Sequence, residues 1–364
     1  MTPEHLKPLT SLRFFAAAWV VLFHYWPKLA VDFTPALVSK GYLGVELFFV
    51  LSGFILCHVY LASAGEKRFD YGAFLWARLA RVYPLHLATL LGVGLLAGAA
   101  TLAGFGIDGS VLSWESLPAN LLMVHAWGLA PEAGWNHPSW SISAEWFAYL
   151  TFPLLAWAAW RLRARPVTAV VAGSALLFVA YAAFERLAGF SLTQATIAWG
   201  ALRIVPCFAF GCAVYLAWKA GAVSRPGVAA LGAVASLAGI LFAAGFGASD
   251  AATVSLFGFL ILSLAGTASA GSKFLTAAPF VWLGEVSYSV YMVCVPWKLL
   301  AVNAAAKLLG LQTEQLPWPV WLAVVLAIVP LAGLSYHLVE KPARERMRAL
   351  AERRRAAGAA PALA

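Results

Sequence analysis

Charged residues are scarce in this chain. Only 11% of its 364 residues are Asp, Glu, Lys or Arg, while 62% are hydrophobic. A soluble globular domain carries about 25% charged residues, so this composition excludes an ordinary soluble protein. The net charge of +9 does not indicate nucleic-acid binding, because the basic residues lie between and after the apolar segments, where membrane topology places them.

Cysteine is scarce as well, and its distribution excludes two kinds of site. The four cysteines, Cys57, Cys207, Cys212 and Cys294, lie in apolar segments and have neither disulfide nor metal-ligand spacing. We therefore expect buried, unpaired thiols and no metal site. No phosphate-binding glycine loop or internal repeat is evident either, so the chemistry must come from single polar residues within apolar segments.

Long apolar runs, in contrast, recur along the whole chain. A spanning helix needs about 20 mainly apolar residues. One run, 117–130, holds only about 14 residues and includes Asn120 and His125. The eleven candidate segments are 9–26, 41–63, 83–105, 117–130, 140–160, 167–187, 198–218, 226–247, 251–270, 277–298 and 318–339.

The distribution of basic residues decides whether segment 117–130 crosses the membrane. If it does not cross, 19 of the 25 basic residues fall on one side, which is the cytoplasmic side. We therefore predict an all-α polytopic membrane protein with ten transmembrane helices, cytoplasmic N- and C-termini, and a short re-entrant or interfacial helix at 117–130. Residues 1–342 would form the membrane domain, and 343–364 a basic cytoplasmic tail against anionic lipid.

Two ionisable residues share one face of the first predicted helix. Arg13 and His24 are about three helical turns apart, or roughly 16 Å along the axis. An ionisable side chain in a spanning helix usually faces a cavity or a partner. The pair therefore predicts a lined passage, with Arg13 near its cytoplasmic mouth and His24 in its outer third.

Other polar residues follow the same division by depth. Arg78 and Arg81 share a helical face just before Pro84 and lie near Arg13 in depth. The outer third is predicted to hold His24, Glu46, Glu145 and Arg203. The passage would thus have a basic inner mouth and an outer chamber with a histidine and carboxylates.

Seven motifs in register resemble the acyltransferase 3 family of integral membrane acyltransferases, which acylate envelope sugars and related acceptors. They are LTSLRFFAAAWVVLFHYW at 9–26, GYLGVELFFVLSGFIL at 41–56, RLARVYPLH at 78–86, WNHPSWSISAEWFAYLTFPLL at 135–155, RIVPCFAFG at 203–211, GEVSYSVYMVCVP at 284–296 and SYHLVEKP at 335–342. The chain departs from the family pattern at Cys294, where a His is frequent, and at His137, where a Gly is frequent.

The resemblance implies an acyl donor from the cytoplasm, typically acetyl-coenzyme A, and an acceptor hydroxyl on the outer side. A basic mouth can hold the phosphates of coenzyme A while the thioester extends toward the outer chamber. We expect Arg13, Arg78 and Arg81 to bind the donor, and Tyr288 and Ser287 to contact the thioester or its oxyanion. The alternative is that the arginines anchor helices at the inner headgroup layer.

In the outer chamber, His24 is the candidate general base, because an imidazole can accept the proton of a sugar hydroxyl near neutral pH. His24 could equally carry the acyl group as a covalent relay. Glu145 could orient His24, bind the acceptor or form a structural pair with Arg203. The predicted substrate-binding residues are Glu46, Asn136, Ser139, Trp140 and Arg203.

The expected acceptor is a saccharide of an exopolysaccharide or O-antigen, free or lipid-linked, although the family also includes enzymes that act on small molecules such as macrolides. The expected location is the inner membrane of a bacterium, alone, as a homo-oligomer or within a polysaccharide assembly complex. A transporter of the donor or of a lipid-linked saccharide is the main alternative, since a polar passage among ten helices serves either purpose. A transporter would usually show paired repeats, which this sequence lacks.

Overall fold

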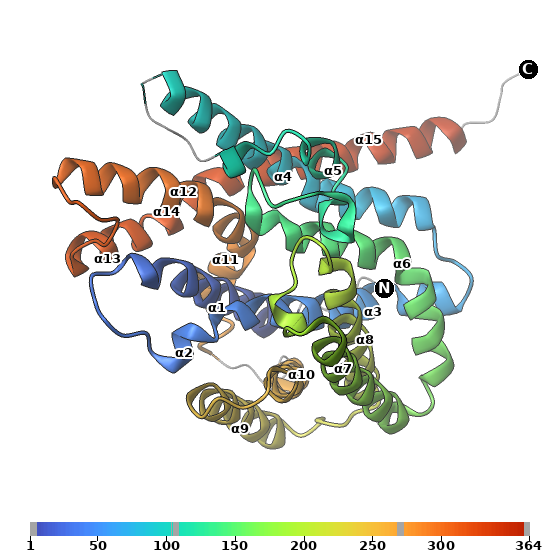
Figure 1. The fold of residues 1–364 in the computed structure, drawn as a ribbon. Helices are drawn as coiled ribbons and strands as arrows, with labels where there is room; N and C mark the ends of the chain where they lie inside the picture. Colours follow the sequence, from blue (N-terminus) through green and yellow to red (C-terminus); the bar gives the residue numbers. More distant parts are fainter. Residues whose placement is uncertain (1–5, 103, 105–108, 268–272, 360–364) are drawn as a thin grey trace, which may run out of the picture.

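The computed structural model describes residues 6–102, 104, 109–267 and 273–359, and these residues are mostly helical (Figure 1). The one β-pairing among them is an isolated bridge between Leu29 and Leu316. The predicted all-α class is therefore confirmed for the described residues. The four cysteines are buried and unpaired, as expected.

Eight helical stretches of the described chain are long and apolar enough to cross a membrane. They are Gly41–Gly65, Tyr71–Leu102, Pro166–Ala188, Gly200–Lys219, Pro226–Gly245, Asp250–Thr267, Ser287–Leu308 and Trp318–Arg353. Two further helices of spanning length, α1 (Lys7–Tyr25) and α6 (Trp140–Leu162), are less apolar. These two helices carry the candidate site residues Arg13, His24 and Glu145.

Seven of the eight stretches correspond to long single helices. The first contains α3 (Gly44–Gly65), which follows η2 (Gly41–Leu43). The next are α4 (Tyr71–Leu102), α7 (Pro166–Ala188), α8 (Gly200–Lys219), α9 (Pro226–Gly245), α10 (Asp250–Thr267) and α12 (Ser287–Leu308). The last stretch contains α13 (Trp318–Leu326), α14 (Ile328–Ser335), η7 (Tyr336–Glu340) and part of α15 (Lys341–Ala359).

Two predicted segments differ from the structure in their bounds. The segment 83–105 belongs to α4, which begins earlier, at Tyr71. The first turns of this helix contain Arg78 and Arg81, so a search for apolar runs does not detect them. The segment 277–298 is divided into α11 (Ala278–Glu285) and α12. At this break Gly284 packs against the backbone of Thr10, a contact that the apolar pattern does not reveal.

The predicted interfacial segment 117–130 forms two short helices, α5 (Leu117–Leu121) and η4 (His125–Leu129). Each has five residues, far fewer than a membrane span requires. The other short elements are η1 (Trp26–Lys28), α2 (Ala36–Ser39), η3 (Gly109–Leu112), η5 (His137–Ser139) and η6 (Leu192–Gln194).

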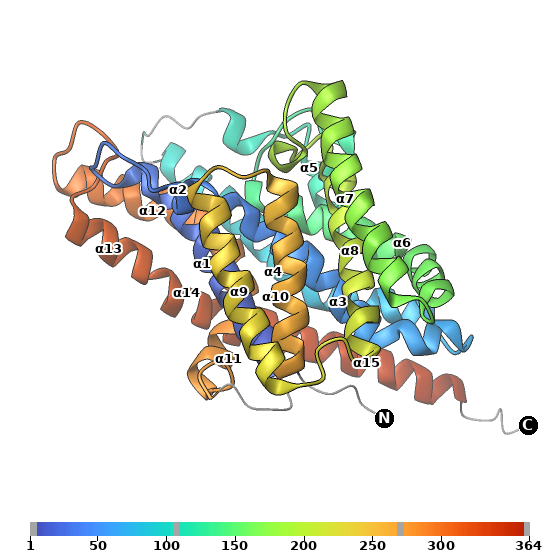
Figure 2. The same ribbon diagram turned by 90° about the horizontal axis from the view of Figure 1, so that it is seen from below.

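Helices α3 and α8 cross at the centre of the bundle. Gly53 of α3 faces the backbone of Phe208, and Gly211 of α8 faces the backbone of Val50, so any larger side chain would collide there. Small residues allow membrane helices to approach this closely. Buried residues make up 78% of the core stretch of α8 but only 28% of α7 and of α9, so α7 and α9 are peripheral. Figure 2 shows α7, α8, α9 and α10 side by side.

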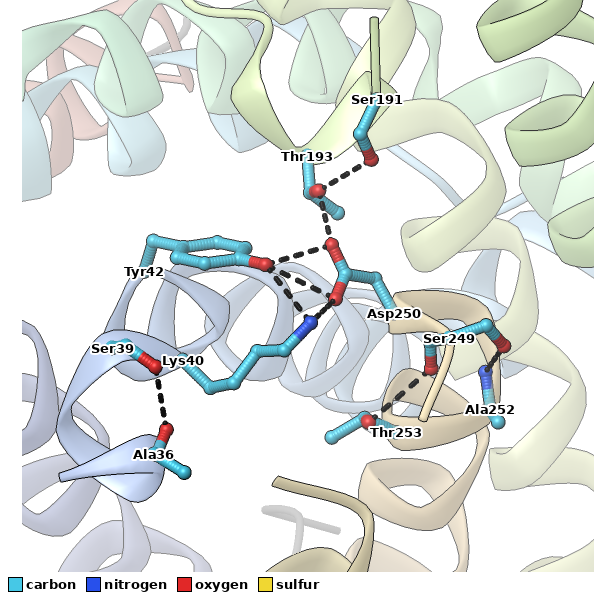
Figure 3. Close-up of polar contacts among 10 residues, drawn as sticks. All are labelled: Ala36, Ser39, Lys40, Tyr42, Ser191, Thr193, Ser249, Asp250, Ala252 and Thr253. Atoms are coloured by element: carbon cyan, nitrogen blue, oxygen red, sulfur yellow. Dashed lines mark hydrogen bonds and ion pairs between the residues drawn. The ribbon is translucent and has the colours of Figure 1, made fainter. Parts of the chain in front are cut away.

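A hydrogen-bond network joins three loops at one end of the bundle (Figure 3). Asp250, the first residue of α10, accepts hydrogen bonds from Lys40 Nζ at 2.7 Å, the Tyr42 hydroxyl at 3.0 Å and Thr193 Oγ1 at 2.5 Å. The network thereby ties α10 to the loops before α3 and at η6. In Figure 2, α2 and α5 lie on the upper side, whereas the start of α1 and the end of α15 lie on the lower side.

Candidate active site

A cavity of about 670 Å³ lies within the bundle and is lined by residues of α1, α3, α4, α6, α12 and α15. On α3 its lining extends from Val45 to Val59, a rise of about 21 Å. The lining residues Leu9, Thr10 and Arg13 lie within two turns of α1, and Leu6 directly precedes this helix. The cavity is therefore elongated along α3 rather than confined to one level of the bundle.

Four arginines line this cavity, and the structure brings the three predicted ones together from two helices: Arg13 from α1, and Arg78 and Arg81 from α4. The five ion pairs among the described residues include none of the three. Arg13 and Arg81 are also close enough to repel each other electrostatically. Half-buried positive charges that form no ion pair are costly, so this part of the cavity is suited to an anionic ligand.

Aromatic side chains hold Arg78 in place. Its guanidinium carbon lies 5.6 Å from the ring centroid of Tyr60, 5.9 Å from that of Tyr149 and 6.0 Å from that of Phe74. Its Nη2 donates to the Tyr60 hydroxyl at 3.3 Å, whereas its buried Nε has no hydrogen-bond partner. Cation–π contacts orient the group but do not neutralise it, so a donor remains for a ligand.

Glu145 of α6 also lines the cavity, and Ser52 Oγ donates to its Oε1 at 2.7 Å. Arg13 lies within electrostatic range of this carboxylate. On the same wall, Ser141 donates to the hydroxyl of Tyr291, which donates to the carbonyl of Pro138 at 2.9 Å. The cavity thus combines positive charge with one carboxylate and several hydroxyl groups.

His24 lies outside the cavity lining. The outermost lining residue of α3 is Val45, and the adjacent Gly44 packs against Ala16 and Val20 of α1. This end of the cavity is therefore level with Ala16 to Val20, one to two helical turns from His24, whereas the outermost lining residue of α1, Arg13, lies about three turns from it. The structure does not bring Glu145 to His24, because Glu145 contacts Ser52, about two turns further along α3 from Val45.

The imidazole of His24 has a defined orientation. Its Nδ1 lies 2.9 Å from the carbonyl oxygen of Val20, which can only accept a hydrogen bond, so Nδ1 carries a proton. In the neutral ring Nε2 then keeps its lone pair and can accept a proton. Lys298 and His137 are the electrostatic neighbours of His24. Burial and the charge of Lys298 lower the pKa of His137, so that ring is neutral at pH 7.

Glu46, Arg203 and Trp140 form one buried unit away from the cavity. Arg203 Nε donates to Glu46 Oε1 at 2.5 Å, and its Nη1 donates to the carbonyl of Ala195 at 2.8 Å. Its guanidinium lies 4.6 Å from the ring centroid of Trp140. The structural partner of Arg203 is therefore Glu46 and not Glu145. An acceptor could bind to Glu46, Arg203 or Trp140 only if their contacts with one another first broke.

The other predicted acceptor residues, Asn136 and Ser139, are buried too. Asn136 Nδ2 donates to the carbonyl of Met292 at 2.9 Å, while its Oδ1 has no partner. Ser139 Oγ lies 3.1 Å from His125 Nε2. Burial lowers the pKa of His125 to about 3, and the neighbouring His86 contributes a smaller part of this shift. The ring of His125 is therefore neutral at pH 7.

Of the two predicted thioester contacts, only Tyr288 lines the cavity. Its hydroxyl donates to the carbonyl of Val82 at 2.7 Å, which fixes the ring. Ser287 is buried beside it and donates to the carbonyl of Gly284 at 2.7 Å, at the break between α11 and α12. Ser287 therefore supports the position of Tyr288 from outside the cavity.

Three residues that line the cavity were not singled out by the sequence: Ser52, Tyr291 and Arg348. The four-residue spacing of Ser141, Glu145 and Tyr149 did predict one helix face, and all three line the cavity. Ser52 and Tyr291 meet this face from other helices, and spacing within one helix carries no information on such partners. Arg348 lies in the segment that we assigned to a lipid-bound tail.

Comparisons with known proteins identify the family of the chain. Residues 8–337 match the acyltransferase domain family called acyltransferase 3. The chain is 30% identical to acyltransferase MdmB of Streptomyces mycarofaciens, over 96% of this chain and 93% of that protein. It is 24% identical to nodulation protein 10 of Rhizobium leguminosarum bv. viciae, over 96% of each chain. No solved structure matches the chain.

A shorter match extends the set of relatives. The chain is 40% identical to protein 2 in the picA locus of Rhizobium radiobacter, over 24% of this chain and 44% of that protein. The family match covers most of the chain, including α1 with its arginine and histidine and α4 with its two arginines. The chain therefore belongs to the acyltransferase 3 family and is a membrane-associated acyltransferase.

Proposed function

We propose that this acyltransferase moves an acyl group, typically acetyl, from cytoplasmic acyl-coenzyme A to a hydroxyl of an envelope or exopolysaccharide sugar. The observation that carries the proposal is the elongated cavity lined by four arginines, none of which forms an ion pair among the described residues. Coenzyme A has its phosphates at one end and its thioester at the other. A long cavity with concentrated positive charge suits such a molecule.

The donor would lie along α3. Arg13, Arg78 and Arg81 would bind its phosphates, and the pantetheine arm would extend past Tyr288 toward Val45. Ser287 would act indirectly by holding Tyr288. Because the packing of Gly44 against Ala16 and Val20 closes the space between the cavity and His24, the thioester would reach the imidazole only after this contact opens.

In the transfer step, His24 Nε2 accepts the proton of the acceptor hydroxyl as that oxygen attacks the carbonyl carbon of the thioester. The tetrahedral intermediate collapses, the C–S bond breaks, and the thiolate takes the proton from His24. The products are an ester and the free thiol of coenzyme A. In the alternative relay, His24 attacks the thioester first and then passes the acyl group to the hydroxyl. Glu145 would contribute from within the cavity, near Arg13, and not as a direct partner of His24.

The acceptor, free or lipid-linked, would approach His24 from the outer side. We propose that Glu46, Asn136, Ser139, Trp140 and Arg203 contribute to the acceptor site after a local opening. Asn136 Oδ1 and Glu46 Oε2 are buried without a hydrogen-bond partner, so each could accept a hydrogen bond from a sugar hydroxyl. Ser139, Trp140 and Arg203 already bond to the protein through a polar group or ring.

This scheme requires a defined topology, which we propose as ten spans in a bacterial inner membrane with both termini cytoplasmic. Single cysteines at Glu115, Glu132 and Arg163 test it, since all three positions are exposed and the four native cysteines are buried. An impermeant thiol reagent applied to intact cells should label positions 115 and 132 but not 163. Labelling of position 163 from outside would contradict the topology.

The catalytic assignment is tested with the variants His24→Ala and His24→Gln in purified full-length protein. Labelled acetyl-coenzyme A and a panel of bacterial polysaccharides should yield labelled glycan and free coenzyme A with the wild type. We expect the variants to transfer acetyl groups about 10²- to 10⁴-fold more slowly, with donor binding retained. His337→Ala removes an exposed histidine outside the cavity lining and should be fully active.

Retention of wild-type transfer by both His24 variants would contradict the assignment. The same experiment separates the two routes. Acid-quenched wild-type protein should carry protein-bound label only in the relay, and His24→Gln should then lose this label. A proteoliposome that moves intact acetyl-coenzyme A without releasing the free thiol would instead support a transporter.

A further inference from the structure

Helix α15 contributes a side chain to the cavity. Arg348 lines it together with the arginines of α1 and α4, although α15 begins at Lys341, beyond the residues that match the family. Its side chain is also exposed, so it lies where the cavity reaches the surface. Trp76 Nε1 donates to the carbonyl of the adjacent Met347 at 2.7 Å, which fixes this part of α15 against α4.

Positive charge surrounds Arg348. Its electrostatic neighbours include Arg344, Arg78 and Arg81. Arg344 has its own partner, since it pairs with Glu340 at 3.5 Å. Arg348 forms none of the five ion pairs found in the described part of the chain. Arg348, Arg78 and Arg81 form no ion pair among the described residues and repel one another, and a polyanion is the ligand that relieves this repulsion.

The arginines are ordered from the interior to the rim of the cavity. Arg13 neighbours Arg81, and Arg78 lies about one turn nearer to the start of α4. Arg348 is the exposed member. Coenzyme A has two separate phosphate groups, a diphosphate next to the pantetheine arm and a 3′-phosphate on the ribose at the far end. If the thioester points toward His24, the ribose end lies at the rim.

We propose that Arg348 binds the 3′-phosphate of the acyl-coenzyme A donor at the rim of the cavity, so that α15 completes the donor site. This inference rests on the proposed function, because it takes its donor from it. The phosphate of an anionic lipid headgroup has the same chemistry and could occupy the same place. The two sources differ in one respect that an experiment can use, since only the donor can be prepared without its 3′-phosphate.

The experiment measures donor affinity by titration calorimetry with full-length protein in nanodiscs of phosphatidylcholine, with and without phosphatidylglycerol. Acetyl-coenzyme A is compared with 3′-dephospho-acetyl-coenzyme A for the wild type, Arg348→Gln, Arg348→Lys and Arg346→Gln. Arg346 is the matched control, because it is an exposed arginine of the same helix that does not line the cavity.

We expect Arg348→Gln to weaken acetyl-coenzyme A binding about ten-fold and to leave the affinity for the 3′-dephospho donor unchanged. The wild type should prefer acetyl-coenzyme A over the 3′-dephospho donor by a similar factor. Arg348→Lys should keep part of this preference, and Arg346→Gln all of it. Because Arg348 is exposed, these variants should remain folded, which a thermal melt verifies.

Two outcomes would overturn the inference while leaving the proposed function intact. One is equal binding of acetyl-coenzyme A by the wild type and Arg348→Gln. The other is a loss that is equal for both donors, or that appears only in nanodiscs containing phosphatidylglycerol, which would assign Arg348 to a lipid headgroup. A wild type without affinity for either donor would overturn the proposed donor as well, so the two failures are distinguishable.

Discussion

The bundle contains arginines in two contrasting surroundings. Arg203 is 2% exposed and has a carboxylate, a backbone carbonyl and an indole ring as partners. Arg13, Arg78 and Arg81 face a cavity and form none of the ion pairs of the described chain. The comparison teaches that pairing, rather than depth in the bundle, separates an arginine that holds helices together from one that is available to a ligand.

The largest expected effect is on stability. Arg203→Met leaves the Glu46 carboxylate buried and uncompensated, and breaking a buried pair in this way costs about 3–5 kcal/mol. The melting temperature in detergent should fall accordingly, and adding Glu46→Gln should restore a large part of it. Arg81→Met should melt like the wild type or higher. Equal melting temperatures for Arg203→Met and Arg81→Met would erase the distinction between the two groups.

The next effect is on donor binding. Arg81→Gln should weaken the affinity for acetyl-coenzyme A about ten-fold or more, because a hydrogen bond to a charged group contributes about 1.5–3 kcal/mol. The wild-type affinity should fall as salt is raised, and the slope should be smaller in the variant. Calorimetry at two salt concentrations measures both quantities. Unchanged affinity in Arg81→Gln would return this residue to the role of a headgroup anchor.

The smallest effect concerns a pair of intermediate burial. Lys40 and Asp250 are 22% and 9% exposed, so Asp250→Asn should cost only about 1 kcal/mol. Burial alone would lower the pKa of Lys40, but the hydrogen bond and charge of Asp250 outweigh it and raise that pKa above its ordinary value of 10.5. The contribution is therefore complete below pH 10.5 and is lost as the pH rises through the folded-state value.

Melting curves of the wild type and Asp250→Asn across this range measure the effect. The difference between them should be constant from neutral pH to about pH 10 and should shrink above it. A difference that grows with rising pH would show that the pair does not stabilise the protein through the charge of Lys40.

Features that depend on a single helix, such as its position in the chain and the depth of its residues, were predicted well from the sequence. Apolar runs located the helices, and depth along them placed Arg13, Arg78 and Arg81 at the level where one cavity now contains them. Pairing between helices was not predictable, because it depends on how each helix is rotated about its axis. Glu145 could not be assigned to Ser52, nor Arg203 to Glu46, from depth alone.

Breaks in helices were hidden for a similar reason. The interruption at Val286 lies within a continuous apolar run and is fixed by the contact of Gly284 with α1. The distance between the cavity and His24 was also not predictable. It depends on the packing of Gly44 against Ala16 and Val20, which closes the space between α1 and α3.

The cavity wall combines the first helix of the described chain with the last, since Arg13 belongs to α1 and Arg348 to α15. During synthesis, α1 and the helices that follow it are made before α15. The cavity wall therefore stays incomplete until residue 348 has left the ribosome. A nascent chain with most of its helices inserted would thus still lack a finished donor site. If the donor site is as proposed, the enzyme would bind and use its acyl donor only after α15 has been synthesised.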